Sequence, residues 1–234
     1  MSDSMTRTRF GDLTLERNIL RNSFVWMTLG LAFTGIVAWG VSNSPGLVRA
    51  LVLNRFLFYG LVFGQLGAVW FLASRVLKMS PAAAAATFVG YSGLTGVTLS
   101  VIFLVYTAGS IASVFFITAG MFASLAFLGY ATKIDLTRMG SYLAMGVIGL
   151  IIASVVNIFL RSDGLGWIVS LAGVAIFSGL TAYDVQKIKA LSARFGSEVD
   201  EGNYLRLSIY GALQLYLDFI NLFLHLLRLT GRRR

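Results

Sequence analysis

Cysteine is absent from this chain, histidine occurs once and proline only twice. Without cysteine the chain can form no disulfide bond, no thiolate nucleophile and no cysteine metal site. A single histidine does not make a metal site either. A phosphate-binding loop of the Walker type is also missing, which argues against a pump driven by nucleotide hydrolysis. We expect no cofactor.

Charge is scarce as well. Charged residues make up 12% of the chain, whereas an average soluble domain has about a quarter, and 57% of the residues are hydrophobic. A soluble domain of this size could not bury so much apolar surface. A helix crosses a bilayer of about 30 Å with roughly 20 mostly apolar residues, and such runs follow one another from Ser23 almost to the carboxyl end. The composition predicts an all-α integral membrane protein.

Seven apolar runs predict seven transmembrane helices joined by short loops, so that consecutive helices are antiparallel neighbours. Pro81 after Ser80 indicates a helix start, because proline at the first helical position loses no hydrogen bond and serine caps the turn. We expect one transmembrane domain of residues 23–229 between a cytoplasmic tail of residues 1–22 and a basic tail of residues 230–234. The predicted spans are Ser23–Ser42, Asn54–Ser74, Pro81–Tyr106, Ser110–Tyr130, Gly140–Leu160, Leu165–Gln186 and Leu207–Leu229.

The basic residues predict the orientation. With the amino terminus in the cytoplasm, four basic residues of the tail and eight of the inner loops, 12 in all, face the cytoplasm, against three in the outer loops. We therefore expect a multi-pass protein of a bacterial inner, or plasma, membrane. Arg228 and Arg232 to Arg234 break the pattern: they lie outside if the seventh segment crosses fully, and inside if it is re-entrant. The outer three are Arg49, Arg55 and Arg161.

The formal net charge of +9 does not indicate nucleic acid as a partner. The basic residues occur in short loops between apolar runs, where they act as topology signals and as contacts for anionic lipid. The lipid bilayer is the expected partner.

Small residues recur at four-residue spacing, which lets helix backbones approach closely in lipid. The spacing predicts helix packing and no chemistry. The pairs are Gly60 with Gly64, Ser92 with Gly96, and Ala175 with Gly179.

Two acidic residues stand out because they fall inside predicted spans, Asp184 in the sixth and Asp218 in the seventh. A charged side chain at the centre of a membrane helix costs about 2.5 to 3.5 kcal/mol unless it faces protein or water, so each is a candidate functional residue. For Asp184 a second interpretation stays open. Lys187 follows at i+3, and a local ion pair at the membrane interface would also account for the aspartate.

The two spans form a hairpin through the Ile188–Arg206 loop. If the sixth helix runs on to about Leu191 and the seventh begins near Tyr210, each aspartate lies about 10 to 12 Å from its helix end, at 1.5 Å per residue. Asp184 and Asp218 could then meet at similar depth. Two carboxylates in contact do not readily both ionise, so such a pair would share a proton and sense pH.

The seventh span carries a polar stripe. Gln214, Asp218, Asn221 and His225 follow steps of four, three and four, which places them on one face of a helix. One interpretation is a pore lining with oxygen ligands suited to a hard cation such as Ca²⁺, with Asp184 and Asp218 as metal ligands. The other is hydrogen bonding between packed helices.

Arg75 ends the second span on the side where Asp184 ends the sixth. It is a candidate charge partner for the aspartate pair. A simpler interpretation is a basic residue that snorkels to the cytoplasmic interface.

At these residues the sequence resembles the Bax inhibitor, or transmembrane Bax inhibitor motif, family, over nearly the whole chain. The segment 215–223, Leu-Tyr-Leu-Asp-Phe-Ile-Asn-Leu-Phe, followed by Leu-Leu-Arg at 226–228, is similar to the family's closing signature. Tyr183-Asp184 with Gln186 and Ile188 resembles its sixth-helix motif, and Asn157-Ile158-Phe159 resembles the end of its fifth.

The resemblance implies a fold in which a central seventh helix is surrounded by the other six. It also implies a pH-sensitive Ca²⁺ leak gated by two aspartates. Asp184 and Asp218 match the family's paired carboxylates, and Arg75 matches, by position at a helix end, the arginine that can latch onto the first of them.

Two other function classes deserve comparison with the leak. A membrane scaffold that binds a membrane protease or another membrane partner would keep the buried pair for packing or regulation and would pass no ions. An intramembrane aspartyl protease needs aspartates on two neighbouring spans, but Asp218 follows Tyr216-Leu217 rather than a Gly-x-Gly turn and no proline follows it. We therefore expect no enzymatic activity.

Overall fold

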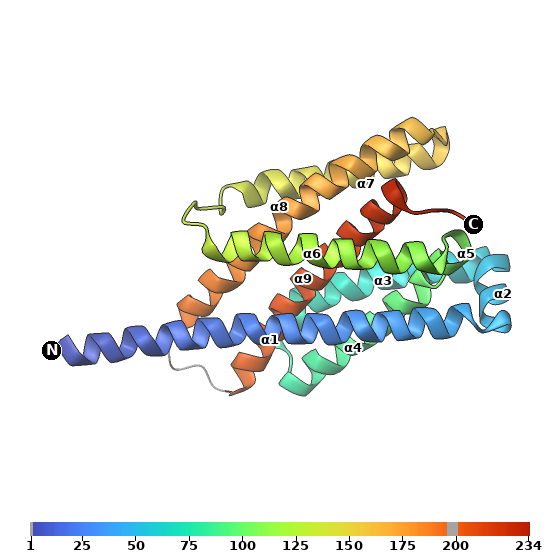
Figure 1. The fold of residues 1–234 in the computed structure, drawn as a ribbon. Coiled ribbons are helices and arrows are strands. Elements are labelled where there is room, and N and C mark those ends of the chain that lie inside the picture. The colour runs from blue at the N-terminus through green and yellow to red at the C-terminus, as the bar shows by residue number, and fades with distance from the viewer. Residues whose placement is uncertain (1, 196–200) are drawn as a thin grey trace. The chain divides into compact units, whose positions relative to one another are not determined.

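The computed structural model describes the backbone of residues 2–195 and 201–234 and the side chains of residues 18–193 and 202–234 (Figure 1). Within these ranges the regular structure is helical, with one isolated backbone bridge and no strand. The chain divides into two compact units. Unit 1 comprises Met1–Val105, Leu191–Tyr216 and Arg234, and unit 2 comprises Tyr106–Ala190 and Leu217–Arg233.

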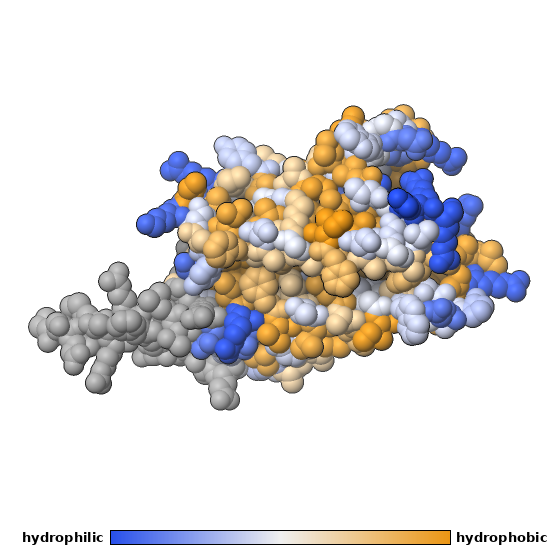
Figure 2. Space-filling view, viewed as in Figure 1, coloured by the Kyte–Doolittle hydropathy of each residue, from blue (hydrophilic) through white to orange (hydrophobic). Residues whose placement is uncertain are grey.

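The seven predicted spans are confirmed, because seven stretches of the described chain are long and apolar enough to cross a membrane. Figure 2 shows apolar residues over much of the visible surface, with strongly hydrophilic residues near the helix ends. Short elements α2, Pro45–Leu53, and η1, Val76–Lys78, lie between spans. The spans are formed by α1 Ser2–Ser42, α3 Arg55–Arg75, α4 Pro81–Leu99 with α5 Ile102–Val105, α6 Ala108–Ala131, α7 Met139–Leu160, α8 Asp163–Phe195 and α9 Glu201–Thr230.

Helix ends follow local capping and extend beyond the apolar runs. Ser80 caps α4 as predicted, its Oγ accepting a hydrogen bond from the Ala83 N–H at 3.3 Å. Helix α8 runs on to Phe195, beyond the predicted span end at Gln186 and beyond the helix end near Leu191 that the sequence suggested, because backbone hydrogen bonds continue where the apolar pattern stops. Helix α1 begins at Ser2, so the backbone of the predicted tail of residues 1–22 is helical. The side chains of residues 1–17 lie outside the described residues, and the tail's role stays a prediction.

In unit 1, helix α1 packs against α4 through small residues. A Cβ added at Gly96 would lie 2.7 Å from both the Thr34 carbonyl oxygen and the Val37 Cβ, so the two backbones approach too closely for any side chain. The prediction for Ser92 and Gly96 is therefore confirmed. The prediction for Gly60 and Gly64 is wrong, because both face open space in the structure: the spacing shows where a close approach is possible, not which face has a neighbour.

In unit 2, helix α6 approaches α8 at Gly129, where a Cβ would collide with the backbone of Ala182. The sixth-span glycine of the predicted small pair, Gly179, packs against Leu143 of α7 as expected. Phe219 of α9 contacts Phe122 of α6, with ring centroids 5.4 Å apart. A buried apolar cluster joins α7, α8 and α9: Leu150, Val169, Phe177 and Leu222.

Helix α9 is the most enclosed of the seven spans, as predicted for a central helix. Of its most apolar window 67% is buried, against 6% for the spans of α3 and α7. Its first part, to Tyr216, belongs to unit 1, and the remainder belongs to unit 2. On the second part, Asp218 is buried inside protein.

Candidate functional site

The two aspartates lie together in unit 2, Asp184 on α8 and Asp218 on α9. Each is only 4% exposed. Both positions fall within membrane-spanning stretches. Carboxyl groups in such surroundings are expensive to keep, because neither water nor lipid head groups solvate them.

The two carboxyl groups lie within side-chain hydrogen-bonding distance of each other. A carboxylate oxygen can only accept, so a hydrogen bond between them requires that one carboxyl keeps its proton. The second oxygen of Asp218, Oδ2, is buried and has no hydrogen-bond partner among the described residues. A polar atom left in that state costs about 1 to 3 kcal/mol, which packing alone does not explain.

Lys187 is the cation next to this pair. Its Nζ lies 3.4 Å from Asp184 Oδ1, one helical turn along α8. The same ammonium group lies 5.6 Å from the centre of the Tyr183 ring. The local ion pair considered for Asp184 is thus present, but it does not account for the site, because Asp184 is buried and also contacts Asp218.

The segment that carries Asp184 is fixed from two sides. On one side, α6 packs closely against the α8 backbone at Ala182, because Gly129 has no side chain. On the other, Gln186 holds the loop between α6 and α7: its Nε2 donates to the Ile134 carbonyl at 2.9 Å and its Oε1 accepts from the Leu136 N–H at 2.7 Å. Gln186 belongs to the motif that resembles the family, which implied no role for it. In the structure it holds the α6–α7 loop against α8.

The loop contains a third aspartate with the opposite character. Asp135 is fully exposed, and its carboxylate accepts hydrogen bonds from the Thr137 hydroxyl and from the Thr137 N–H, the latter at 2.9 Å. These two bonds stabilise the ionised form and lower the pKa of Asp135 below its usual value of 3.8. Unit 2 therefore holds a buried pair of aspartates as well as the exposed residues Asp135 and Asp163.

The other members of the polar stripe have different surroundings. Asn221 donates from Nδ2 to the Leu217 carbonyl of its own helix at 2.8 Å. His225 stacks on Phe177, with ring centroids 5.7 Å apart, and packs against Gly173. These contacts favour a packing role for both residues. Gln214 belongs to unit 1, and the pore-lining role of all three stays a prediction.

Sequence comparisons identify the relatives of this chain. A family model described as "Inhibitor of apoptosis-promoting Bax1" matches residues 16–234. The chain belongs to the Bax inhibitor family. It is 46% identical over 233 residues to the inner membrane protein YbhL of Escherichia coli strain K12, covering 100% of this chain and 97% of that protein. It is also 44% identical to an uncharacterized protein of Borreliella burgdorferi, over 95% of this chain and 98% of that one.

Family membership and the seven apolar helices together make this chain a multi-pass membrane protein. A protein of Rickettsia prowazekii is a further relative, 42% identical over 95% of this chain and 92% of its own length. Among these relatives, YbhL is named as an inner membrane protein.

In this Bax inhibitor family member, Arg75 is the last residue of α3, in unit 1. Its pairing with Asp184 in unit 2 stays a prediction. Within unit 2 the cation beside Asp184 is Lys187, which the sequence offered only as the basis of the simpler interpretation.

The ligand chemistry at the pair is limited. Among the described residues, no group of three or more histidine or acidic side chains could hold a metal ion. The two carboxyl groups are the only acidic ligands that α8 and α9 bring together at this depth within the described structure.

The carboxyl-terminal tail lies at the far end of α9 from the α8–α9 loop. Helix α9 is continuous over Glu201–Thr230, and the tail is then bound to the start of α6, where the Thr107 N–H donates to the Arg232 carbonyl at 3.1 Å. A full crossing by α9 therefore fits the structure, and a re-entrant seventh segment does not.

Proposed function

We propose that this Bax inhibitor family protein is a pH-sensitive cation leak of a bacterial inner membrane. Ca²⁺ is the proposed permeant ion, and the Asp184–Asp218 pair is the proposed gate. The excess of basic residues in the tail and in the loops on its side of the membrane supports a cytoplasmic amino terminus. In an alternative proposal the chain is a scaffold for a membrane protease or another membrane partner.

One observation carries the leak proposal. Two carboxyl groups meet inside membrane-spanning helices, and one of their four oxygen atoms, Asp218 Oδ2, is buried without a hydrogen-bond partner among the described residues. A site kept only for packing would gain stability if that atom were replaced by an apolar group. Asp218 Oδ2 can instead accept a proton or bind a cation, and this would explain why a carboxyl group is kept at this position.

The small number of oxygen ligands at the pair supports the passage of Ca²⁺ rather than its tight binding. Ca²⁺ takes about six to eight oxygen ligands in a tight site, and two carboxylates supply at most about four. A conducting site must bind its ion weakly enough to release it. A carboxylate pair without a third acidic ligand within the described structure meets that requirement.

The contact between Lys187 and Asp184 supports a closed state of the gate. The ammonium group, 3.4 Å from Asp184 Oδ1, occupies the carboxylate that an entering cation would need. Protonation of the pair would oppose cation entry in the same way, which makes the path sensitive to pH. Arg75 is proposed as a second cation that acts on Asp184, and Gln214, Asn221 and His225 are proposed to line the path.

The test is Ca²⁺ entry into liposomes that contain purified protein, over about pH 5 to 8, for the wild type, Asp184→Asn and Asp218→Asn. We expect flux whose pH dependence is lost in both variants. Asp135→Asn is the matched control, since it makes the same chemical change at an exposed aspartate of the same unit, and its flux should equal that of the wild type.

If folded wild-type protein passes no Ca²⁺ at any pH in this range, the leak proposal is wrong. The scaffold proposal would then replace it.

A further inference from the structure

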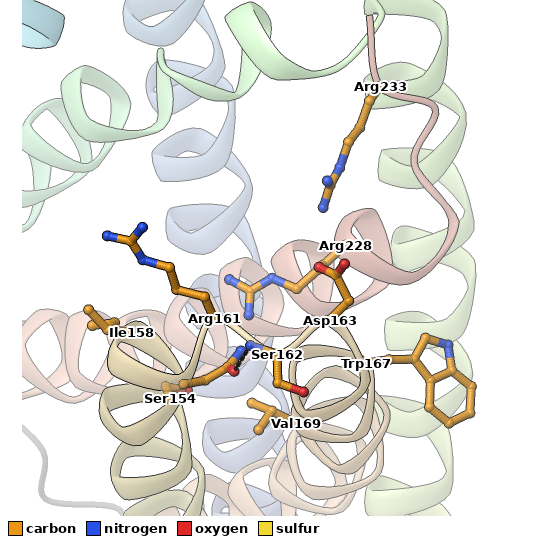
Figure 3. A pocket seen from close by; sticks show the side chains of 11 residues that line it. Ser154, Ile158, Arg161, Ser162, Asp163, Trp167, Val169, Arg228 and Arg233 are labelled. Carbon is orange, nitrogen blue, oxygen red and sulfur yellow. Dashed lines mark hydrogen bonds between the residues drawn. The ribbon is translucent and has the colours of Figure 1, made fainter.

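A cavity of about 730 Å³ lies in unit 2 at the end of α7, the start of α8 and the end of α9 (Figure 3). On α8, Asp184 is 21 residues from the first helical residue, Asp163, or roughly 32 Å at 1.5 Å per residue, and on α9, Asp218 is 10 residues from Arg228, or roughly 15 Å. Neither aspartate lines the cavity, which is thus a separate feature.

The cavity has an excess of positive charge. Its lining includes Arg161, Arg228 and Arg233, and a single acidic residue, Asp163. Figure 3 shows Arg228 from α9 extending toward the side of Arg161, and Arg233 extending from the tail into the same region. No carboxylate of the described residues lies within 4.0 Å of these three guanidinium groups. Two positive charges are therefore in excess, and the guanidinium groups are open to an anion.

The wall formed by the α7–α8 turn has a fixed backbone. Arg161 adopts a left-handed conformation, with φ of 50°, which costs a residue with a side chain about 1 to 2 kcal/mol. Asn157 holds the turn: its backbone carbonyl accepts from the Arg161 N–H at 2.8 Å, and its Oδ1 accepts from the Ser162 N–H at 3.0 Å. With Oδ1 engaged in this way, the amide of Asn157 presents Nδ2, a donor, on its other side.

The tail that carries Arg233 is also fixed. The Arg232 N–H donates to Ser110 Oγ at 2.9 Å, and the Thr107 N–H donates to the Arg232 carbonyl at 3.1 Å. Tyr106 and Arg233 form a backbone bridge. Arg233 is therefore held at the cavity by three contacts with the start of α6.

The rim of the cavity indicates its depth in the membrane. Trp167 and Ile158 line it and are 56% and 69% exposed, so apolar and aromatic surface faces outward beside the arginines. Tryptophan is enriched at the level of the lipid head groups. This mixture of side chains is typical of the depth where lipid phosphates lie.

We propose that this cavity binds a phosphate group, carried either by an anionic lipid head group or by free phosphate. Arginine matches phosphate because its planar guanidinium donates paired hydrogen bonds to two oxygen atoms. Three arginines from the α7–α8 turn, α9 and the tail, with the Asn157 amide beside them, supply such donors from several directions. A bound phosphate would link the end of α9 to the α7–α8 turn. The proposal does not depend on ion conduction.

The experiment measures thermal unfolding of the purified full chain in detergent and phosphate-free buffer, at constant ionic strength. Three additives are compared: inorganic phosphate, dioctanoyl phosphatidylglycerol, and dioctanoylglycerol, which has the same acyl chains and no phosphate. We expect the phosphate-bearing ligand to raise the melting temperature by roughly 5 °C at saturation, and dioctanoylglycerol to leave it unchanged. A response to phosphatidylglycerol alone identifies the lipid as the source, and an equal response to inorganic phosphate identifies the free ion.

Variants locate the binding. Arg161→Gln, Arg228→Gln and Arg233→Gln should each raise the half-saturating concentration about tenfold, the loss of one charge-assisted contact. Arg49→Gln and Arg55→Gln remove the same charge from the other outer loops and should leave binding unchanged. The proposal is overturned if neither phosphate-bearing ligand stabilises the wild type, if dioctanoylglycerol stabilises it equally, or if the control variants weaken binding as much as the cavity variants.

Discussion

The two units use buried polar side chains in different ways. In unit 1, Thr34 Oγ1 lies 2.7 Å from the Tyr216 hydroxyl and donates to the Ser92 carbonyl at 2.9 Å. Gln65 donates to Thr95 Oγ1 at 3.1 Å and accepts from Thr98 Oγ1 at 2.7 Å. These groups are neutral, and donors meet acceptors. In unit 2 the buried hydroxyl groups of Thr118, Ser170 and Thr181 bond to carbonyls of their own helices, and the remaining buried polar groups are two acids. One oxygen of these acids has no partner among the described residues.

The difference separates helix packing from function. Neutral hydroxyl and amide groups hydrogen-bonded across helices are a common means of association in membranes, worth about 0.6 kcal/mol each on average. A pair of acids gives no such gain unless its protonation or its ligands change. We therefore propose that the network of unit 1 contributes stability and that the pair of unit 2 serves ion passage.

The largest expected effect is the contrast between Asp218→Asn and Gln65→Met. Asp218→Asn should lower Ca²⁺ flux through liposomes by about tenfold or more, equivalent to at least about 1.4 kcal/mol, because it removes a carboxylate that the ion needs. Gln65→Met removes two hydrogen bonds of unit 1 and should cost about 1 to 2 kcal/mol of unfolding free energy with flux within about twofold of wild type. Equal loss of flux in both variants would erase the distinction between the units.

Close helix approaches give the next effect. Gly129→Ala and Gly96→Ala each place a Cβ against a neighbouring backbone, and each should lower the free energy of unfolding by about 1 to 3 kcal/mol. Only Gly129→Ala should also change the pH dependence of flux, because α8 carries Asp184. Gly120→Ala, on the same helix as Gly129 with open space around it, is the control and should be neutral or slightly stabilising. Thermal unfolding in detergent and the flux assay measure both properties.

A smaller effect is expected at Lys187. Lys187→Gln removes the ammonium group that lies 3.4 Å from Asp184 Oδ1, and should raise Ca²⁺ flux at neutral pH by about fivefold, since roughly 1 kcal/mol of competition disappears. Lys187→Arg keeps the charge and should behave like the wild type. A fall in flux in Lys187→Gln would show that the lysine assists ion passage instead of closing the path.

The smallest effect concerns the exposed aspartate. Because the pKa of Asp135 is lowered by hydrogen bonds from Thr137, its ionised form stabilises the fold above the usual pKa of 3.8, and this contribution is lost as the pH falls below that value. Thr137→Val should return the pKa toward 3.8, as measured by titration of the labelled carboxyl group in NMR. Flux between about pH 5 and 8 should not change, since Asp135 stays ionised throughout this range. A shift in the pH dependence of flux would mean that solvated carboxylates also contribute.

The seven spans could be predicted from the sequence. In lipid, backbone N–H and C=O groups must form their hydrogen bonds within the helix, so each span is one continuous helix with one long apolar run. Helix ends could not be predicted in the same way. Helix α8 continues through Lys187 and Lys189 to Phe195, a polar stretch in which the hydrophobic pattern does not indicate where the helix ends. The break after Leu99 in α4 is also invisible to an apolar pattern.

Part of the site could be predicted for a similar reason: an acid within an apolar run is rare, and both Asp184 and Asp218 were marked by it. The polar stripe was less informative, because spacing gives the face of a helix and not its neighbour. His225 shares a face with Asp218 yet stacks on Phe177. The arginine cavity was missed entirely, since Arg161 and Arg228 are far apart in the sequence and each resembles an ordinary topology signal.

The central claim is that Asp184 and Asp218 act as one gate, and a double-mutant cycle on Ca²⁺ flux tests it most directly. Flux through liposomes is measured for the wild type, Asp184→Asn, Asp218→Asn and the double variant, all shown to be folded. The account predicts that the double variant loses no more flux than either single variant, within about twofold, because coupled groups give non-additive effects. Losses that multiply in the double variant, or no flux through the wild type above protein-free liposomes, would contradict it.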